Sequence, residues 1–310
     1  MSNDKRYKIC VMMAMYNPKE YVVEQIDSIL NQADVEVNLV IRDDGSVKRE
    51  WVDYVKENYS GIELIEGNNL GIAKNIKTLI DYVYSNYDDY SFFAYSDQDD
   101  FWESDKLITA IRQIEKMDNN LPCLYYSNLM VSDSNLNPQH MHFKKGVVKN
   151  TSGQALARYF VYACTTVINF KMISELHKVG FDNLEYDVAV YLVALFIGNA
   201  FYDEASHIKY RMHGSNLSGQ HRKGFKQLLF RFKQLFNLKN MGRAYEGGAR
   251  YILKHYGDIL DDGKKRECRL VLEYRESFAK KLKLLFSKRV AAGYMPRSLY
   301  NVVRIIVNKY

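Results

Sequence analysis

Two groups of aspartates in the first hundred residues have the types and spacing to bind a metal ion. Asp43 and Asp44 are adjacent, and Asp97, Asp99 and Asp100 lie together in one short segment. Carboxylates rarely lie buried without partners, and several that converge repel one another. A hard divalent cation removes this repulsion, because Mg²⁺ and Mn²⁺ prefer oxygen ligands and leave coordination positions for phosphate oxygens. Asp-x-Asp also occurs in solvated acidic turns, so the surrounding sequence has to decide between the two interpretations.

Each acidic group directly follows a stretch that is typical of a buried strand. Val35–Ile41 leads into Asp43 and Asp44, and Tyr90–Tyr95 leads into Asp97. Apolar residues at helical spacing separate such stretches, which predicts strand–helix–strand units and a mostly parallel sheet flanked by helices. Ligands of these sheets bind beyond the carboxyl ends of the strands. We therefore expect an α/β fold in which both acidic groups meet at one edge of the sheet.

The composition indicates a globular protein with a sizeable core. The chain has 310 residues, of which 47% are hydrophobic and 26% charged, enough for one large domain or a large and a small one. Its cysteines are scattered without a Cys-x-x-Cys pair, which favours reduced cytosolic thiols over a zinc site or a disulfide framework. The apolar runs Ile9–Met15 and Val188–Phe196 are too short for a convincing signal peptide or a transmembrane helix.

Charge is distributed unevenly along the chain, whose net charge is +6. Residues 1–220 contain 21 Lys and Arg against 30 Asp and Glu, whereas residues 221–310 contain 22 against 7. Such asymmetry indicates two regions with different partners, the basic one suited to a polyanion or an anionic membrane surface. We expect a catalytic domain over 1–220 and a basic, amphipathic helical extension over 221–310.

Segments around the acidic groups resemble those of the inverting glycosyltransferases of family 2. In order they are Tyr16-Asn17-Pro18, Arg42-Asp43-Asp44-Gly45-Ser46, Asn69-Leu70-Gly71-Ile72-Ala73-Lys74-Asn75 and Tyr95-Ser96-Asp97-Gln98-Asp99-Asp100-Phe101-Trp102. The last segment and the later Tyr210-Arg211-Met212-His213-Gly214-Ser215-Asn216-Leu217-Ser218-Gly219 resemble the bacterial rhamnosyltransferase-like branch in particular. The resemblance spans residues 9–219 and implies the GT-A fold, a Rossmann-like sheet flanked by helices.

By this resemblance, the residues at the strand ends would bind a nucleotide-diphosphate sugar and a metal ion. Tyr16 and Asp44 would lie at or near the nucleobase, Asp43 would help to bind the nucleotide sugar, and Lys74 would face the phosphates. Asp97 would lie near the ribose and share the Mg²⁺ or Mn²⁺ ion with Asp99. These roles are physically coherent, because a base can stack on an aromatic ring and a lysine offsets diphosphate charge. Core packing for Tyr16 and a solvated helix start for Lys74 remain as alternatives.

The resemblance leaves two further residues with two interpretations each. Trp102 either borders the donor sugar or anchors the loop that follows Asp100. His213 is either a functional residue, as a further metal ligand or in contact with the leaving diphosphate, or a surface residue with an ordinary hydrogen bond.

Inverting transfer also needs a base that removes the proton of the attacking acceptor hydroxyl. The family places an aspartate before an apolar helix, and the matching stretch here is Leu184-Glu185-Tyr186-Asp187-Val188. Asp187 is therefore the expected catalytic base, with a helix N-cap as the structural alternative. Tyr186 and Val188 depart from the family's usual His and Trp, so the acceptor is less well defined than the reaction.

The basic tail contains two amphipathic patterns that suit a membrane interface. Their apolar members are Phe225, Leu228, Leu229, Phe232, Leu235 and Phe236, and then Leu299, Val302, Val303, Ile306 and Val307. Packing against the rest of the protein is the alternative. No RNA-binding signature accompanies the charge, so we expect no nucleic-acid partner. We expect a cytoplasmic protein, peripheral on the inner face of the cell membrane, where a lipid-linked glycan acceptor would be found.

Together these features predict a metal-dependent glycosyltransferase that uses Mg²⁺ or Mn²⁺. The resemblance implies dTDP-β-L-rhamnose as donor, with a UDP-hexose as the main alternative. A non-catalytic nucleotide- or lipid-binding partner in polysaccharide assembly, and a nucleotidyltransferase, are the rival functions from other classes.

Overall fold

The computed structural model describes residues 7–213 and 244–310, which form two compact units. The first unit contains residues 7–145 and 161–212, and the second contains 146–160, 213 and 244–310. The predicted boundary at residue 220 and the predicted amphipathic pattern from Phe225 to Phe236 lie outside the described residues.

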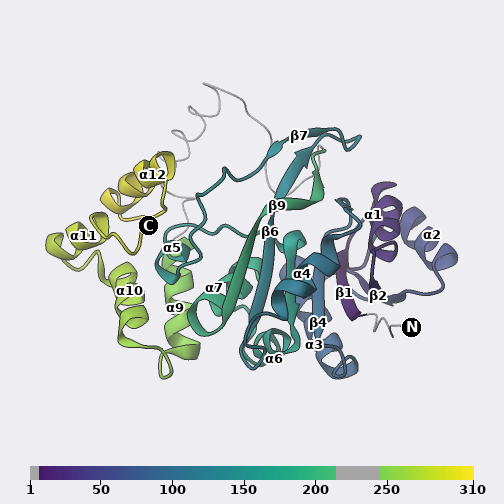
Figure 1. Cartoon of the computed structure of the whole chain (residues 1–310), viewed down its shortest axis with the longest axis horizontal. Helices are drawn as coiled ribbons and strands as arrows, with labels where there is room; N and C mark the ends of the chain where they lie inside the picture. Colours follow the sequence, from purple (N-terminus) through teal and green to yellow (C-terminus); the bar gives the residue numbers. More distant parts are fainter. Residues whose placement is uncertain (1–6, 214–243) are drawn as a thin grey trace. The chain divides into compact units, whose positions relative to one another are not determined.

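A mixed sheet of nine strands, counted over the described residues, forms the centre of the first unit (Figure 1). Its order is β3-β2-β1-β4-β8-β6-β9-β5, with β7 paired to β6. The strands are β1 Tyr7–Met15, β2 Val35–Asp43, β3 Glu63–Glu66, β4 Phe92–Ser96, β5 Phe101–Trp102, β6 Cys123–Ser132, β7 Pro138–Met141, β8 Thr166–Asn169 and β9 Asn199–Arg211. Pairing is parallel between β1, β2, β3 and β4 and between β6 and β9, and antiparallel elsewhere. The expected mixed sheet, with its longest pairings parallel, is confirmed.

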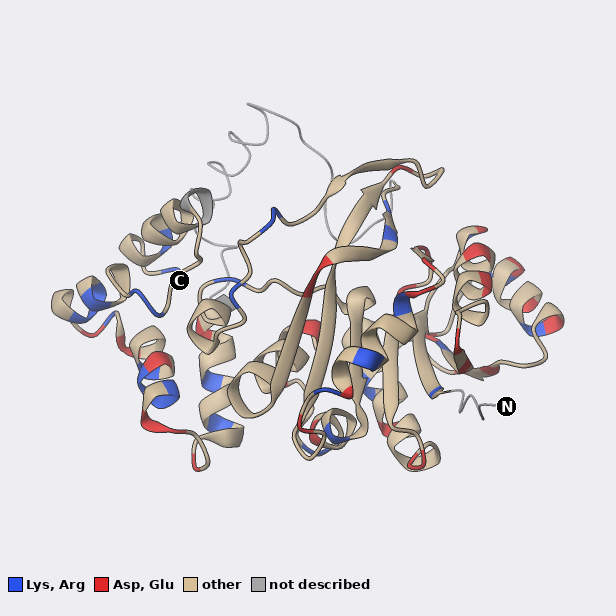
Figure 2. Ribbon diagram, viewed as in Figure 1, with Lys and Arg blue, Asp and Glu red and all other residues tan. Residues whose placement is uncertain are grey.

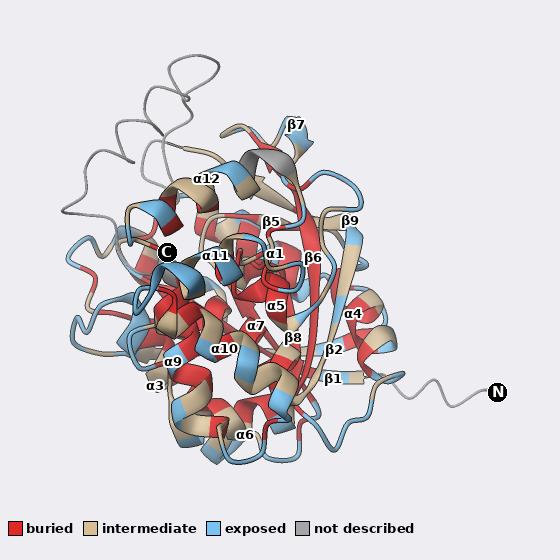
Figure 3. Cartoon of the chain, turned by 90° about the vertical axis from the view of Figure 1, so that its left-hand side faces the viewer, coloured by how far each residue is buried: buried red, intermediate tan, exposed pale blue. Residues whose placement is uncertain are grey.

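Strand β1 is central because its sequence is apolar on both faces. Every residue from Ile9 to Met15 is buried, as expected for a strand that helices cover on both sides. Buried residues occur in the central strands and in the helices that cover them (Figure 3). Each large aliphatic side chain in such a core contributes about 1.5–3 kcal/mol relative to exposure.

Helices follow most strands of the first unit. They are α1 Tyr21–Leu30, α2 Glu50–Asn58, α3 Ile72–Asn86, α4 Lys106–Ile114, α6 Phe170–Val179 and α7 Tyr186–Ile197, with a short 3-10 turn, η1, at Ala163–Thr165. Helix α7 is apolar on almost every side and almost completely buried. It ends at Gly198, where a Cβ atom would lie 1.9 Å from the carbonyl oxygen of Pro122.

The second unit consists of helices around the segment 146–160. The helices are α5 Ser152–Ala155, α9 Ala244–Tyr256, α10 Asp262–Glu273, α11 Phe278–Leu285 and α12 Met295–Ile306. The side chain of Gln154 donates to the carbonyl oxygens of Val147 and Ala292 at 2.8 and 3.2 Å, and Tyr310 donates to that of Leu156 at 2.9 Å. Basic residues are frequent on α10 and α11 (Figure 2). The expected helical C-terminal extension is confirmed, and no helix among the described residues is long and apolar enough to cross a membrane.

Candidate functional site

The strand register brings the two acidic groups together, as predicted. Strand β1 lies between β2 and β4, with Met15 opposite Asp43 and Met13 opposite Ser96. Because all three strands are parallel, the residues that follow them emerge at the same edge of the sheet. Tyr16, Asp44 and Asp97 therefore begin three neighbouring loops at this edge.

The carboxylate of Asp44 is buried and organises the loop before α3. Its Oδ1 accepts hydrogen bonds from Arg42 at 2.6 Å and from the backbone N–H of Leu70 at 2.9 Å, and its Oδ2 accepts from the N–H of Gly71 at 2.8 Å. Arg42 is buried as well, so this is a buried ion pair with additional donors. Asp44 thus shapes the wall of the site, and its direct contact with a nucleobase stays a prediction.

The neighbouring Asp43 stabilises the turn that follows β2. Its carboxylate accepts hydrogen bonds from both the hydroxyl and the backbone N–H of Ser46 and is buried. Gly45 has φ +71°, and a Cβ atom there would lie 2.8 Å from the backbone nitrogen of Asn69, so the turn requires glycine. Asn17, which the sequence reasoning did not single out, ties this turn to the end of β1, because its N–H donates to Ser46 Oγ at 2.7 Å.

Tyr16 and Lys74 both have side chains that reach solvent at this edge. The ring of Tyr16 is 44% exposed, while its backbone N–H and C=O are both hydrogen-bonded to the side chain of Gln98, at 2.9 and 3.2 Å. Lys74 is exposed in the first turn of α3, and its ammonium forms no ion pair with the described residues. Both side chains are therefore accessible to a ligand, and their assigned roles stay predictions.

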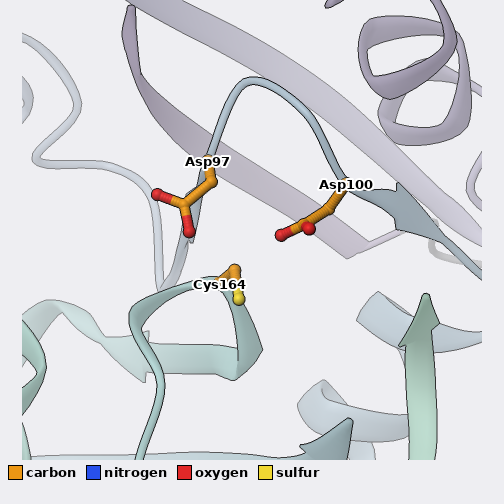
Figure 4. A group of neighbouring side chains, drawn as sticks. All are labelled: Asp97, Asp100 and Cys164. Carbon is orange, nitrogen blue, oxygen red and sulfur yellow. The ribbon is translucent and has the colours of Figure 1, made fainter. Parts of the chain in front are cut away.

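Asp97, Asp100 and Cys164 form a compact cluster in which one potential ligand atom from each lies within 4.8 Å of the others (Figure 4). The two aspartates come from the loop after β4, and Cys164 comes from η1. Burial and the charge of Asp99 raise the pKa of Asp97 to about 7, and the same causes raise that of Asp100 well above its ordinary value. Burial also raises the pKa of the Cys164 thiol, so this side chain is neutral.

The donor set of this cluster fits a divalent cation that prefers oxygen ligands. Oδ2 of Asp100 is buried and has no hydrogen-bond partner among the described residues. The carboxylates of Asp97 and Asp100 face a common point, and Asp99 lies between them in sequence and is only partly buried. A cation at this point would offset the repulsion that raises the carboxyl pKa values. The sequence placed Asp100 in the acidic group but predicted Asp97, Asp99 and His213 as the metal ligands, and it gave no role to Cys164.

Two cationic residues that sequence reasoning also missed support the acidic loop. Arg211, at the end of β9, donates its N–H to Asp100 Oδ1 at 3.1 Å and its Nε to the carbonyl oxygen of Asp99 at 2.9 Å. Lys106 is completely buried, and its Nζ lies 3.5 Å from the centroid of the Trp102 ring with no hydrogen-bond partner in the described parts of the chain. Burial lowers the pKa of Lys106 to about 7, although Cys164 and Asp100 act in the opposite direction.

Trp102 and His213 are placed differently from the other predicted site residues. Trp102 is 1% exposed and lies in the hydrophobic core with Leu107 and Ile111, which corresponds to the anchoring interpretation of this residue. Contact of Trp102 with a sugar stays a prediction. His213 is assigned to the second unit, and its role as a metal ligand stays a prediction.

Asp187 lies in the first turn of α7 with its side chain partly buried. Its Oδ1 accepts a hydrogen bond from the backbone N–H of Val188 at 2.8 Å, whereas the N-cap position belongs to Glu185. Burial, and to a smaller extent the charge of Glu185, raises the pKa of Asp187 to about 7. The ring of the adjacent Tyr186 lies 5.2 Å from that of Tyr95, and the charge of Asp97 contributes to raising the pKa of Tyr95. This contact connects the start of α7 to the acidic cluster, and a carboxylate with such a pKa suits a general base.

Comparison with known proteins gives a consistent family. Residues 10–176 match the family model described as glycosyl transferase family 2. A dTDP-rhamnosyl transferase, RfbG, from Shigella flexneri is 28% identical over 224 residues, which cover 67% of this chain and 73% of that protein. A hyaluronan synthase from Pasteurella multocida is 22% identical over 310 residues, which cover 97% of this chain but 30% of the synthase.

Solved structures of glycosyltransferases share the fold. TarS residues 1–349 from S. aureus, in complex with UDP-GlcNAc, superposes with a TM-score of 0.55 at 12% identity and covers 96% of this chain and 90% of that one. The mannosyltransferase PcManGT from Pyrobaculum calidifontis, in complex with GDP-Man and Mn²⁺, has a TM-score of 0.50 at 14% identity, with 96% and 84% covered. These likenesses confirm the expected GT-A fold.

Proposed function

Because the chain belongs to glycosyl transferase family 2, we propose that it is a metal-dependent enzyme that transfers a sugar from a nucleotide diphosphate to a glycan acceptor. The observation that carries this proposal is the cluster of Asp97, Asp100 and Cys164, together with an Asp187 whose pKa is raised in part by the charge of Asp97. L-Rhamnose from dTDP-β-L-rhamnose is the proposed donor sugar, supported by the likeness to RfbG. A UDP-linked hexose is the second candidate, supported by the fold shared with TarS, whose structure contains UDP-GlcNAc.

Asp97, Asp99 and Asp100 would hold the Mg²⁺ or Mn²⁺ ion, with the neutral Cys164 as a neighbour. When bound, such an ion supplies positive charge that stabilises a departing diphosphate. Lys74 is exposed near the amino end of α3, where its charge and the helix dipole both favour an anion. Tyr16, exposed at the end of β1, offers a ring on which a nucleobase can stack.

Asp187 is the proposed catalytic base. Its carboxylate would remove the proton of the acceptor hydroxyl as that oxygen bonds to the anomeric carbon and the bond from that carbon to the diphosphate breaks. The proton then resides on Asp187, and the attack from the opposite face inverts the configuration of the sugar. General base catalysis of this kind contributes about 10²–10⁴-fold to the rate.

For the acceptor, we propose a lipid-linked or growing cell-surface glycan at the inner face of the cell membrane. In this scheme residues 1–220 form the catalytic domain and residues 221–310 a membrane-associating extension. The support is the excess of 22 basic over 7 acidic residues in the second region.

The substitution Asp187→Asn tests the proposed base. We expect transfer to fall by about 10²–10⁴-fold while nucleotide binding is retained, because the amide keeps the shape but cannot accept the proton. Glu185→Gln is the matched control, since Glu185 is exposed two residues away and is expected to leave the rate within a few fold. If no transfer is found in the wild-type protein with any donor, a non-catalytic role replaces this proposal.

The donor is tested by thermal stabilisation with dTDP, UDP and GDP, each with Mn²⁺. A ligand at a hundred times its dissociation constant adds about 2.7 kcal/mol of stability, which is readily measured. We expect the largest shift with dTDP, whereas a larger shift with UDP would transfer the assignment to a UDP-hexose.

A further inference from the structure

Helix α12 in the second unit buries two polar residues beside Ile305, which is 4% exposed, and leaves two large apolar residues exposed. Asn301 and Arg304 are buried, at 6% and 7% exposure, whereas Leu299 and Ile306 are 65% and 59% exposed. The amide nitrogen of Asn301 donates to the carbonyl oxygen of Ala157 at 2.8 Å, and Nε of Arg304 donates to that of Lys309 at 2.7 Å, whereas Oδ1 of Asn301 has no partner among the described residues. The buried polar residues are therefore part of the folded structure, and the exposed apolar residues have to be explained.

The neighbouring helix α11 also presents apolar side chains to solvent. Phe278 and Phe286 are each 75% exposed, and Leu282 between them is 36% exposed. Positions four residues apart lie on the same side of a helix, so these three form one stripe. Lys281 of α11 donates to the carbonyl oxygen of Ile306 at 3.5 Å, which places the two helices next to each other (Figure 3). We call the exposed set Phe278, Leu282, Phe286, Leu299 and Ile306 the apolar surface of α11 and α12.

The charge around this surface indicates which kind of partner would bind to it. Residues 277–310 contain eight Lys and Arg residues and no Asp or Glu. The chain's own segment 214–243 contains seven basic and no acidic residues, so it does not complement that charge, and neither does a second copy of the same surface. An RNA would match the charge but not the exposed leucine, isoleucine and phenylalanine side chains. An anionic lipid surface matches both, because its headgroups attract basic residues and its acyl chains accept apolar ones.

We propose that α11 and α12 form the face by which this protein docks on an anionic membrane, with Phe278 and Phe286 inserted at the level of the lipid headgroups. Lys283, Lys288 and Arg289 are exposed within α11 or just after it, and they would contact the lipid phosphates. The docking face rests on the proposed function only for its purpose, which is to bring the enzyme to a lipid-linked acceptor. Binding to lipid itself requires neither donor nor metal.

Sedimentation of the full-length protein with vesicles tests this face. The vesicles contain either phosphatidylcholine alone or an equimolar mixture with phosphatidylglycerol, and no nucleotide is present. We expect binding to the mixed vesicles only, and its loss in the double variant Phe278→Ser, Phe286→Ser. Ile259→Ser is the matched control, since Ile259 is 73% exposed in the same unit but outside both helices. Lys283→Glu is expected to weaken binding by at least about fivefold, whereas Lys116→Glu in the first unit is expected to leave it unchanged.

The outcomes separate this inference from the proposed function. Thermal stabilisation by dTDP with Mn²⁺ is measured on the same variants and is expected to match the wild type, because the substituted side chains lie on the surface of the second unit. The docking face is overturned if the wild type does not bind the mixed vesicles, or if the double variant binds as well as the wild type. It is also overturned if the wild type forms dimers in solution that the double variant does not form. Failure of vesicle binding with intact nucleotide binding refutes the docking face alone.

Discussion

At the scale of single residues, burial raises the pKa of three carboxyl groups of the site. Two basic residues, Lys106 and Arg211, lie close to Asp100. Asp97, Asp100 and Asp187 all have raised pKa values, and Lys106 has a lowered one. Perturbed groups of this kind concentrate at functional sites, because catalysis and ligand binding need charge in places where folding alone would avoid it.

The pKa of Asp187 predicts the pH dependence of transfer. A base acts only when deprotonated, and burial raises the pKa of this carboxyl to about 7. We therefore expect kcat/KM to rise with pH through about 7 and then level off. In Glu185→Gln, the loss of a neighbouring negative charge lowers the pKa of Asp187, so the rising limb should move to lower pH. A pH–rate profile of both proteins checks this. If the rising limb does not move, the charge of Glu185 does not affect the pKa of Asp187.

The burial of Lys106 is expected to make the difference in stability between the wild type and a Lys106→Met variant depend on pH. Because its pKa falls from 10.5 to about 7 on folding, the unfolded chain binds more protons between these values, and this residue makes stability rise with pH across that window. Lys106→Met removes the buried charge, and we expect the variant to be more stable than the wild type by about 1–4 kcal/mol at pH 7. Denaturant unfolding should show this advantage shrinking towards pH 10. A variant that is less stable at pH 7 would mean that the pairing of Lys106 with Asp100 outweighs its burial.

At the scale of elements, parallel strands determine which loops meet. Asp44 at the end of β2 accepts hydrogen bonds from the loop before α3, and Gln98 after β4 is bonded to the backbone at the end of β1. Hydrogen bonds between neighbouring loops therefore stabilise each of them. The parallel strands, rather than any single loop, determine where the site forms.

Removal of the Asp44 carboxylate is expected to release this loop. Asp44→Ala leaves the buried Arg42 without its charged partner, although Arg42 keeps its hydrogen bonds to Asn75 and Asn68; this costs about 3–5 kcal/mol of unfolding free energy and should weaken nucleotide binding. Asp53→Ala is the control, because Asp53 forms an exposed ion pair with Arg49 on α2 and should cost less than about 1 kcal/mol. Urea denaturation distinguishes the two, and equal small losses would show that Asp44 does not hold the loop.

The elements near the amino terminus were predictable because their signals are local. Apolar runs such as Ile9–Met15 give β1, and the parallel arrangement then predicts where Asp43 and Asp97 meet. The contribution of Cys164 was not predictable, because it depends on β8 entering the sheet antiparallel to β4. The burial of Lys106 likewise depends on the packing of α4, which propensity does not reveal. Spacing in the sequence carries no information about such long-range contacts.

At the scale of the whole molecule, the two units differ in charge and in the surfaces that they expose. The segment 146–160 belongs to the second unit, although nothing in its composition separates it from its neighbours. Its hydrogen bonds to the C-terminal helices show why, since Asn301 and Tyr310 donate to its carbonyl oxygens. Leu299 and Ile306 belong to an amphipathic pattern that the sequence already indicated, but only the structure shows that both are exposed and that α11 with Phe278, Leu282 and Phe286 lies next to α12.

The central claim is that the acidic loop after β4 binds a nucleotide diphosphate through a divalent cation. Calorimetric titration of dTDP into the full-length protein, with and without Mn²⁺, tests it most directly, using Asp97→Asn and the control Asp89→Asn. Asp89 is exposed just before the opposite end of β4. We predict that binding is at least about tenfold weaker without Mn²⁺ or in Asp97→Asn, a difference of about 1.4 kcal/mol, and unchanged in Asp89→Asn. Equal affinity with and without the cation, or an Asp97→Asn variant that binds like the wild type, would contradict the account.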